Sequence, residues 1–199
     1  MNAVGKIGLG CLGAVGAWCV LLRPRKNQPG WEELAGVKYA HRGLHDQARS
    51  VPENSMAAFR RAVEHGFGAE LDVHLMADGE LAVVHDSDLT RVCGRQAYIE
   101  DLTAADLGEY PLMGTQETIP LFREVLALFE GRTPLVIELK VERNNANALT
   151  DRVMAALEGW KGSYCLESFH PGVLLRLKER YPQVLRGQLS QNFLKASEV

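Results

Sequence analysis

The sequence predicts an α/β fold in which parallel strands alternate with helices that pack outside them. From Val37 onward, short apolar runs of strand length alternate with segments that carry apolar residues at helical spacing. The composition, with 46% hydrophobic and 24% charged residues, is that of an ordinary globular protein. Such alternation is typical of parallel sheets, and the turn signal Asp78-Gly79 marks one expected exception, an antiparallel hairpin.

The first 26 residues predict an N-terminal transmembrane helix. Residues 7–22 contain no charged side chain, and Arg23, Arg25 and Lys26 follow closely. Length alone leaves a membrane anchor, a signal-peptide core and a buried helix open. The basic residues after the run favour the anchor, because a cleaved signal peptide carries its charge before the run. By the positive-inside rule, we expect a membrane-anchored protein with its body in the cytoplasm.

The expected organisation is therefore an anchor over residues 1–26, a linker over 27–36 and a folded domain over 37–199. The net charge is −3, and residues 1–30 hold four basic residues and no acidic ones, so the remainder carries 18 basic against 25 acidic residues. An acidic body argues against nucleic acid as a partner. The four cysteines lack Cys-x-x-Cys spacing, so they predict neither a disulfide framework nor a zinc site.

Strands and helices are assigned from the period of their apolar residues. Strands are expected over 37–42, 68–75, 81–85, 134–140, 163–169 and 184–189, and helices over 55–65, 121–129, 147–157 and 171–180. In the first helix, Met56, Phe59 and Val63 form one apolar stripe, and Gly66 lies just past its end.

Residues 87–118 form a turn-rich insert between the hairpin and the second expected helix. It contains the turn-rich stretch Gly94-Arg95-Gln96 and a short helix expected to begin at Thr103, in the pattern Thr103-x-x-Asp106. Long loops commonly shape access to a functional site, and we assign the insert that role.

Acidic side chains share one face of two expected strands. Alternation along a strand puts Glu70 beside Asp72 and, on a second strand, Glu138 beside Lys140. Neighbouring carboxylates repel each other unless a cation lies between them, and a divalent metal is the usual solution. The alternative for an isolated pair is a solvated strand face.

A two-residue hairpin at Asp78-Gly79 would bring a histidine to the same patch. In that register His85 lies opposite Asp72 and on its face. A second histidine, His41, ends the strand 37–42 in the sequence His-Arg-Gly. We therefore expect two histidines to lie near the carboxylates.

Six short motifs together resemble the glycerophosphodiester phosphodiesterase family. They are His41-Arg42-Gly43, Pro52-Glu53-Asn54-Ser55, Glu70-Leu71-Asp72-Val73, Asp78-Gly79, Val84-His85-Asp86 and Ile137-Glu138-Leu139-Lys140. Each motif alone is weak, but they occur in one order and with compact spacing. The resemblance implies a TIM-type (β/α) barrel that hydrolyses glycerophosphodiesters to glycerol 3-phosphate and an alcohol.

The resemblance also implies roles for single residues. It assigns metal binding to Glu70, Asp72 and Glu138, and acid and base catalysis to His41 and His85, without saying which histidine does which. Because all three ligands are oxygen donors, the metal is expected to be Ca²⁺ or Mg²⁺. Arg42 and Lys140 balance the charge of a phosphodiester substrate. Glu53 is expected to contact substrate or its surroundings, although as an acid at a helix start it also suits a capping role. The nucleophile is either water or the neighbouring glycerol hydroxyl.

Length leads to a further expectation, and two rival readings of the function stay open. An eight-stranded barrel needs about 250 residues, so we expect the last strands to be missing and the chain to be a fragment or to close as a homo-oligomer. A related possibility is a phospholipase D-like enzyme of the same superfamily acting on lysophospholipids. From another class, the chain would be an inactive metal-binding scaffold.

Overall fold

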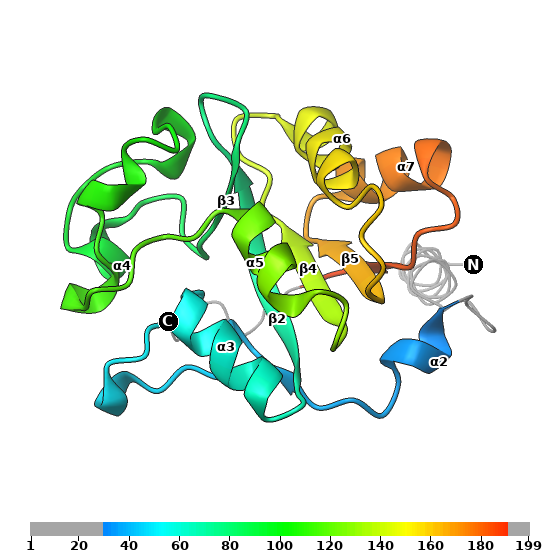
Figure 1. Ribbon diagram of the computed structural model, residues 1–199. Helices are drawn as coiled ribbons and strands as arrows, with labels where there is room; N and C mark the ends of the chain where they lie inside the picture. Colours follow the sequence, from blue (N-terminus) through cyan, green and yellow to red (C-terminus); the bar gives the residue numbers. More distant parts are fainter. Residues whose placement is uncertain (1–29, 191–199) are drawn as a thin grey trace, which may run out of the picture.

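The computed structural model describes residues 30–190, which form one curved sheet covered by helices (Figure 1). Within these residues the sheet has six strands in the order β1-β2-β4-β5-β6, with β3 paired to β2. The strands are β1 Tyr39–Ala40, β2 Gly68–Leu75, β3 Leu81–Val83, β4 Leu135–Leu139, β5 Tyr164–Ser168 and β6 Arg186–Gln188. The α-helices are α2 Trp31–Leu34, α3 Met56–Glu64, α4 Thr90–Cys93, α5 Phe122–Phe129, α6 Ala146–Ala156 and α7 Pro171–Arg180.

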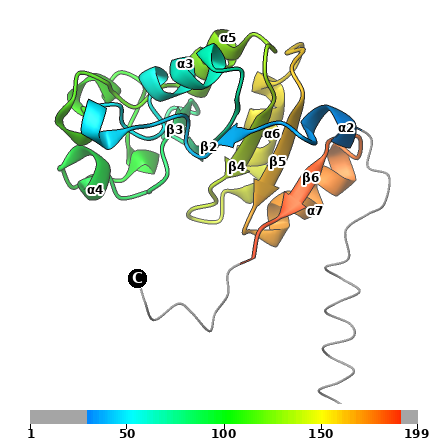
Figure 2. The same cartoon turned by 90° about the horizontal axis from the view of Figure 1, so that it is seen from below.

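The predicted α/β architecture is confirmed. All neighbouring strands pair in parallel except β2 and β3, which are antiparallel. Helices α3, α5 and α6 lie along one side of the sheet, and α7 packs against α6, β5 and β6 (Figures 1 and 2). Each of the four expected long helices is present, and both ends of each lie within one residue of the predicted ends.

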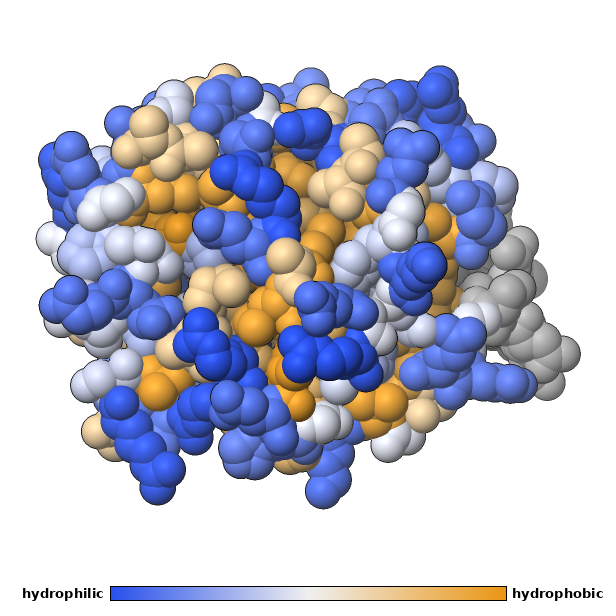
Figure 3. Space-filling model, in the orientation of Figure 1, coloured by the Kyte–Doolittle hydropathy of each residue, from blue (hydrophilic) through white to orange (hydrophobic). Residues whose placement is uncertain are grey.

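Alternation along the central strands separates an apolar side from a polar side. On β2, Ala69, Leu71 and Val73 are fully buried in the core shared with the helices. Glu70 and Asp72 therefore lie on the opposite side, as the strand period requires. Within the described residues, β1 and β6 are the ends of the sheet and do not pair with each other. The helix-covered side is polar at its surface, with apolar side chains visible between charged ones (Figure 3).

The register of the hairpin differs from the prediction. Val73 faces Val83, and Met76 donates its N–H to the carbonyl of Glu80, so the loop holds three residues and not two. The reason is Gly79, whose φ of 82° closes a three-residue loop in the left-handed region. Val84 donates to the Asp72 carbonyl at 3.1 Å, so Val84 and not His85 lies opposite Asp72.

The insert has its own apolar core and contains little regular helix. Leu89, Val92, Ile99 and Leu112 are buried in this second cluster. The segment holds α4 and three short 3₁₀ helices, η2 Ile99–Asp101, η3 Leu107–Glu109 and η4 Leu112–Gly114. The helix expected to begin at Thr103 is absent from that position. There, the Asp106 carboxylate accepts two hydrogen bonds from Thr103, which close a turn before η3.

The predicted membrane anchoring is corrected. Among residues 30–190, no helix is long and apolar enough to cross a bilayer. The segment 1–26, on which the anchor and the membrane-attached cytoplasmic location were based, lies outside the described residues. Part of the expected linker 27–36 is the short helix α2, and its Leu34 is buried. The boundaries 1–26, 27–36 and 37–199 stay predictions.

Candidate active site

Three carboxylates meet on the polar side of the sheet. Glu70 and Asp72 come from β2, and Glu138 comes from β4, where it is the direct neighbour of Asp72 in the parallel register. One oxygen from each lies within 4.8 Å of the others. Asp72 is 0% exposed and Glu138 is buried, so these acids are not a solvated strand face. The strand period and the pairing of β2 with β4 bring together the three residues that the sequence predicted to converge.

The cluster is electrostatically costly for the protein alone. Burial and the neighbouring Asp72 carboxylate raise the pKa of Glu70 to about 8. Burial likewise raises the pKa of Glu138, against the hydrogen bond and charge of Lys140. Both shifts favour the protonated acids, because charged carboxylates in a shared site repel one another.

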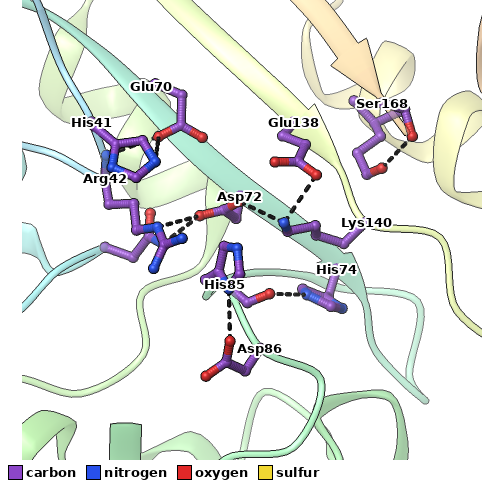
Figure 4. A network of polar contacts seen from close by, with 12 residues as sticks. His41, Arg42, Glu70, Asp72, His74, His85, Asp86, Glu138, Lys140 and Ser168 are labelled. Carbon is purple, nitrogen blue, oxygen red and sulfur yellow. Dashed lines mark hydrogen bonds and ion pairs between the residues drawn. The ribbon is translucent and has the colours of Figure 1, made fainter. Parts of the chain in front are cut away.

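Two cations flank Asp72 (Figure 4). The Lys140 Nζ atom lies 3.1 Å from Asp72 Oδ1 and 2.9 Å from Glu138 Oε1. On the other side, Arg42 Nε lies 3.6 Å from Asp72 Oδ2. The backbone N–H of Arg42 also donates to Glu70 Oε2 at 2.8 Å. The site thus combines three acidic groups on two adjacent strands, β2 and β4, with two basic residues that follow β1 and β4.

The donor set fits a hard divalent cation. Asp72 Oδ1 is buried and accepts no hydrogen bond in the described structure, although Lys140 lies close to it. The other contributed atoms are carboxylate oxygens, which are the donors that Ca²⁺ and Mg²⁺ prefer. Glu70, Asp72 and Glu138 are therefore the residues that could hold such an ion.

Asn54 is a site residue that sequence reasoning did not select. Its side-chain amide, buried at the start of α3, donates to Asp72 Oδ2 at 2.8 Å and orients that carboxylate. Its own N–H donates to the Arg42 carbonyl at 2.9 Å, and both residues have positive φ, 51° for Asn54 and 54° for Arg42. Gly43 follows with a φ of 77°, and a Cβ there would lie 2.9 Å from the Cβ of Ala58. The His-Arg-Gly and Glu-Asn motifs therefore specify one strained backbone junction. The motif Pro52-Glu53-Asn54-Ser55 was the available signal for Asn54.

His41 lies at the edge of the carboxylate cluster. Its side chain is 72% exposed, and its Nε2 atom lies 3.8 Å from Glu70 Oε2. Partial burial and the Arg42 charge lower the pKa of His41, although Asp72 acts in the opposite direction. A lowered pKa increases the neutral fraction of this imidazole at neutral pH.

His85 lies on the other side of the site and is oriented by its neighbour. Its Nδ1 atom is 2.6 Å from Asp86 Oδ1 (Figure 4). His85 lines the same cavity as Glu138 and Lys140, even though the hairpin register differs from the expected one. Strand β3 ends at Val83, so the strand period no longer determines the direction of His85.

Buried and charged groups hold the segment around His85 in place. His74 is buried, and its Nδ1 lies 2.6 Å from Glu100 Oε1. The His74 Nε2 atom lies 3.3 Å from the His85 carbonyl, and Ser87 donates to the other oxygen of Glu100. These contacts connect β2 to the insert directly below the site.

Glu53 contacts Arg42, and it is not a cap of α3. Its Oε1 atom accepts from Arg42 Nη1 at 2.8 Å and from Arg91 Nη2 at 2.7 Å, whereas Ser55 caps the helix.

The opening of the site is a cavity of about 530 Å³. Its walls include Phe169 and Pro171, beside Lys140 and His85.

A sequence model of the glycerophosphoryl diester phosphodiesterase family matches residues 41–199. The chain belongs to this family. The match contains all eight residues that the sequence had singled out for the site, namely His41, Arg42, Glu53, Glu70, Asp72, His85, Glu138 and Lys140.

Curated relatives of this phosphodiesterase family member include bacterial and mammalian proteins. A glycerophosphodiester phosphodiesterase of Bacillus altitudinis is 32% identical over 157 residues, which are 73% of this chain and 63% of the relative. A lysophospholipase D of Rattus norvegicus is 34% identical over 154 residues, 71% of this chain and 46% of the relative. The chain thus spans less than two thirds of the length of these relatives.

Solved structures of phosphodiesterases share the barrel-like fold. A glycerophosphodiester phosphodiesterase from Thermotoga maritima has a TM-score of 0.65 and 30% identity, covering 79% of this chain and 63% of that one. A phosphodiesterase of Oleispira antarctica, solved with its product sn-glycerol-3-phosphate, has a TM-score of 0.73 and 24% identity over 84% of this chain and 70% of that one. The α/β fold of this family member is therefore TIM-barrel-like, as the motifs implied.

Proposed function

We propose that the chain hydrolyses glycerophosphodiesters to glycerol 3-phosphate and an alcohol. The observation that carries the proposal is the meeting of Glu70, Asp72 and Glu138 beside Lys140, in a member of a phosphodiesterase family. The relative from Bacillus altitudinis, named for this activity, supports the same substrate class.

We infer that Glu70, Asp72 and Glu138 hold one divalent ion, Ca²⁺ or Mg²⁺. When bound, such an ion offsets the negative charge of the phosphate and of the oxygen that leaves it. The preference for these two ions follows from the exclusively oxygen donors of the cluster.

Arg42 and Lys140 would hold the phosphodiester. Both side chains are largely buried, at 18% and 14% exposure, and both face Asp72. Three carboxylates, one divalent ion and one phosphodiester leave two negative charges, which these two cations balance. Glu53 orients the Arg42 guanidinium by accepting a hydrogen bond from it, so the role of Glu53 in substrate binding is indirect.

His41 and His85 would transfer the protons. One imidazole takes a proton from the attacking hydroxyl, which belongs to water or to the substrate glycerol, and the other gives a proton to the departing alkoxide. The position of His41 beside Glu70 and the place of His85 in the cavity wall beside Lys140 support these roles.

The test is an assay of the purified chain with Ca²⁺ or Mg²⁺, measuring glycerol 3-phosphate released from glycerophosphodiesters. The His41→Ala and His85→Ala variants should each lose activity by about 10²- to 10⁴-fold, because general acid or base catalysis contributes that much. Their melting temperatures should stay close to that of the parent chain. Full activity in both variants would contradict the assigned roles.

A second candidate is the cleavage of lysophospholipids, favoured by the similarity to the rat lysophospholipase D. Release of the head-group alcohol from lysolipid micelles, compared with release from soluble glycerophosphodiesters, separates the two substrates. A third outcome is that neither substrate is turned over and that adding a metal chelator changes only the melting temperature of the chain. That result would identify a metal-binding scaffold.

A further inference from the structure

Arg91, in the insert helix α4, contacts two acidic residues that belong to opposite sides of the site. Its Nε atom lies 2.5 Å from Asp86 Oδ2, and its Nη2 atom lies 2.7 Å from Glu53 Oε1. The two acids are 33 positions apart in the chain, in the segments that follow β1 and β3.

Each acid that Arg91 binds also contacts a residue proposed to act on substrate. Asp86 presents its other oxygen, Oδ1, to His85 Nδ1 at 2.6 Å. Glu53 shares its Oε1 between Arg91 and Arg42, with the Arg42 contact at 2.8 Å. Arg42, Glu53, Arg91, Asp86 and His85 therefore form one continuous chain of charged hydrogen bonds around the site.

We propose that Arg91 is a positioning residue, which fixes Asp86 so that His85 presents Nε2 to the substrate phosphate and which steadies Arg42 through Glu53. The proposal rests on the proposed function, because it deepens the role of the same site. It gives the insert a part in the reaction beyond controlling access.

The hydrogen-bonding chemistry of His85 explains why Asp86 must be fixed. An ionised carboxylate only accepts hydrogen bonds, so a neutral His85 facing it carries its proton on Nδ1 and its lone pair on Nε2. Burial alone would raise the pKa of Asp86, but the hydrogen bonds from Arg91 and His85 outweigh burial and lower it. The pKa of Glu53 is lowered in the same way by Arg91 and Arg42.

Arg91 has the geometry for this task, whereas lysine does not. A planar guanidinium presents several N–H groups in fixed directions, so it can bind two carboxylates at once. The Arg91 side chain is 47% exposed, which means that its replacement opens no core cavity and that a small cation from solvent can reach its place.

The first experiment compares steady-state kinetics of Arg91→Ala and Arg91→Lys with a matched control, Arg95→Ala. Arg95 lies in the same insert, is 55% exposed and pairs with the exposed Glu109. We expect kcat of Arg91→Ala to fall about 10- to 100-fold, as small misplacements of reacting groups do, with KM within about twofold. The Arg95 variant should match the parent chain. Millimolar guanidinium should restore part of the kcat of Arg91→Ala and leave the control unchanged.

Arg91→Lys should regain less than half of the lost kcat, because an ammonium group cannot bind both acids. A rise in KM with unchanged kcat would overturn the proposal, since Arg91 would then act as a substrate-binding cation. Loss of kcat without any guanidinium rescue, in a folded variant, would also overturn it.

The second experiment does not depend on activity. Long-range ¹⁵N–¹H NMR of the imidazole groups, with His85 assigned from a His85→Gln variant, reports which ring nitrogen carries the proton. In the parent chain and in Arg95→Ala, neutral His85 should be protonated on Nδ1, and in Arg91→Ala it should become a mixture of tautomers. An unchanged tautomer in Arg91→Ala would refute the positioning role. If the parent chain shows no turnover, the proposed function fails while the NMR result still decides the role of Arg91.

Discussion

At the scale of single residues, the site is defined by carboxylates that the protein holds close together at a cost. Burial and the neighbouring Asp72 carboxylate raise the pKa of Glu70 to about 8. A carboxyl group whose pKa is higher in the folded chain than in the unfolded chain favours folding at low pH, and this advantage disappears as the pH rises through that range. Metal-free protein should therefore lose stability between about pH 4.5 and pH 8 on account of this group.

The Glu70→Gln substitution tests this expectation. In the presence of a chelator, the variant should melt several degrees above the parent chain at pH 8, because it has no charge to bury. The difference should shrink toward pH 5, where Glu70 is protonated in the folded chain. Thermal melts followed by circular dichroism across this range measure it. A variant that is less stable than the parent at pH 8 would show that Glu70 is ionised without cost.

At the scale of elements, Arg91 and its two acids are one of the attachments of the insert to the rest of the domain. Both Glu53 and Asp86 have lowered pKa values, with burial opposing the effect and hydrogen bonds from Arg91 producing it. Acids of this kind stabilise the folded chain above their unfolded pKa values, and the benefit is lost as the pH falls through the folded values. The attachment of the insert should thus weaken in acid.

A pH series on Arg91→Ala measures this attachment. At pH 7 the variant should melt about 2 °C below the parent chain, since partly exposed ion pairs contribute at most about 1 kcal/mol. As the pH falls through the lowered pKa values of the two acids, both become protonated and the two melting temperatures should converge. Arg95→Ala serves again as the control, with a smaller difference at every pH. A difference that stays constant throughout the acid titration would mean that Arg91 stabilises the insert by packing alone.

The same elements show how much of the fold and of the site could be predicted from the sequence. Helix α7 and strand β2 were predicted at their observed boundaries because apolar period and turn residues act locally. The hairpin register failed by one residue, because the left-handed Gly79 closes a longer loop than the Asp-Gly pair suggests. The carboxylate cluster was accessible because strand period, a local property, determines which face an acid occupies. Asn54 and Arg91 were missed because their partners, Asp72 and Glu53, lie far away in sequence.

At the scale of the whole molecule, the carboxylate cluster joins two central strands, so its occupancy should affect global stability. A divalent ion at a concentration 100-fold above its Kd stabilises the folded state by about 2.7 kcal/mol if the unfolded chain does not bind it. For a chain of this size, this corresponds to a rise of about 5–10 °C in Tm. Differential scanning fluorimetry with Ca²⁺, Mg²⁺ and excess chelator measures this shift.

Glu138→Gln is the matched variant for this measurement. It removes one of the three charged ligands, and its amide still fills the same space beside Lys140. We expect the ion-dependent shift in Tm to fall by more than half. An equal shift in the variant and the parent chain would place the stabilising ion elsewhere.

Because β1 has only two residues, the site residues that follow it should differ in local stability from those on the central strands. Glu70, Asp72 and Glu138 stand on central strands, paired on both sides, whereas His41 and Arg42 directly follow a two-residue strand that pairs with β2. So short an element gains little from its own hydrogen bonds and opens more easily than the strands beside it. We therefore expect the backbone around His41 to open locally more readily than the strands that carry Glu70, Asp72 and Glu138, so that one side of the proposed site can exchange with solvent while the carboxylates stay together.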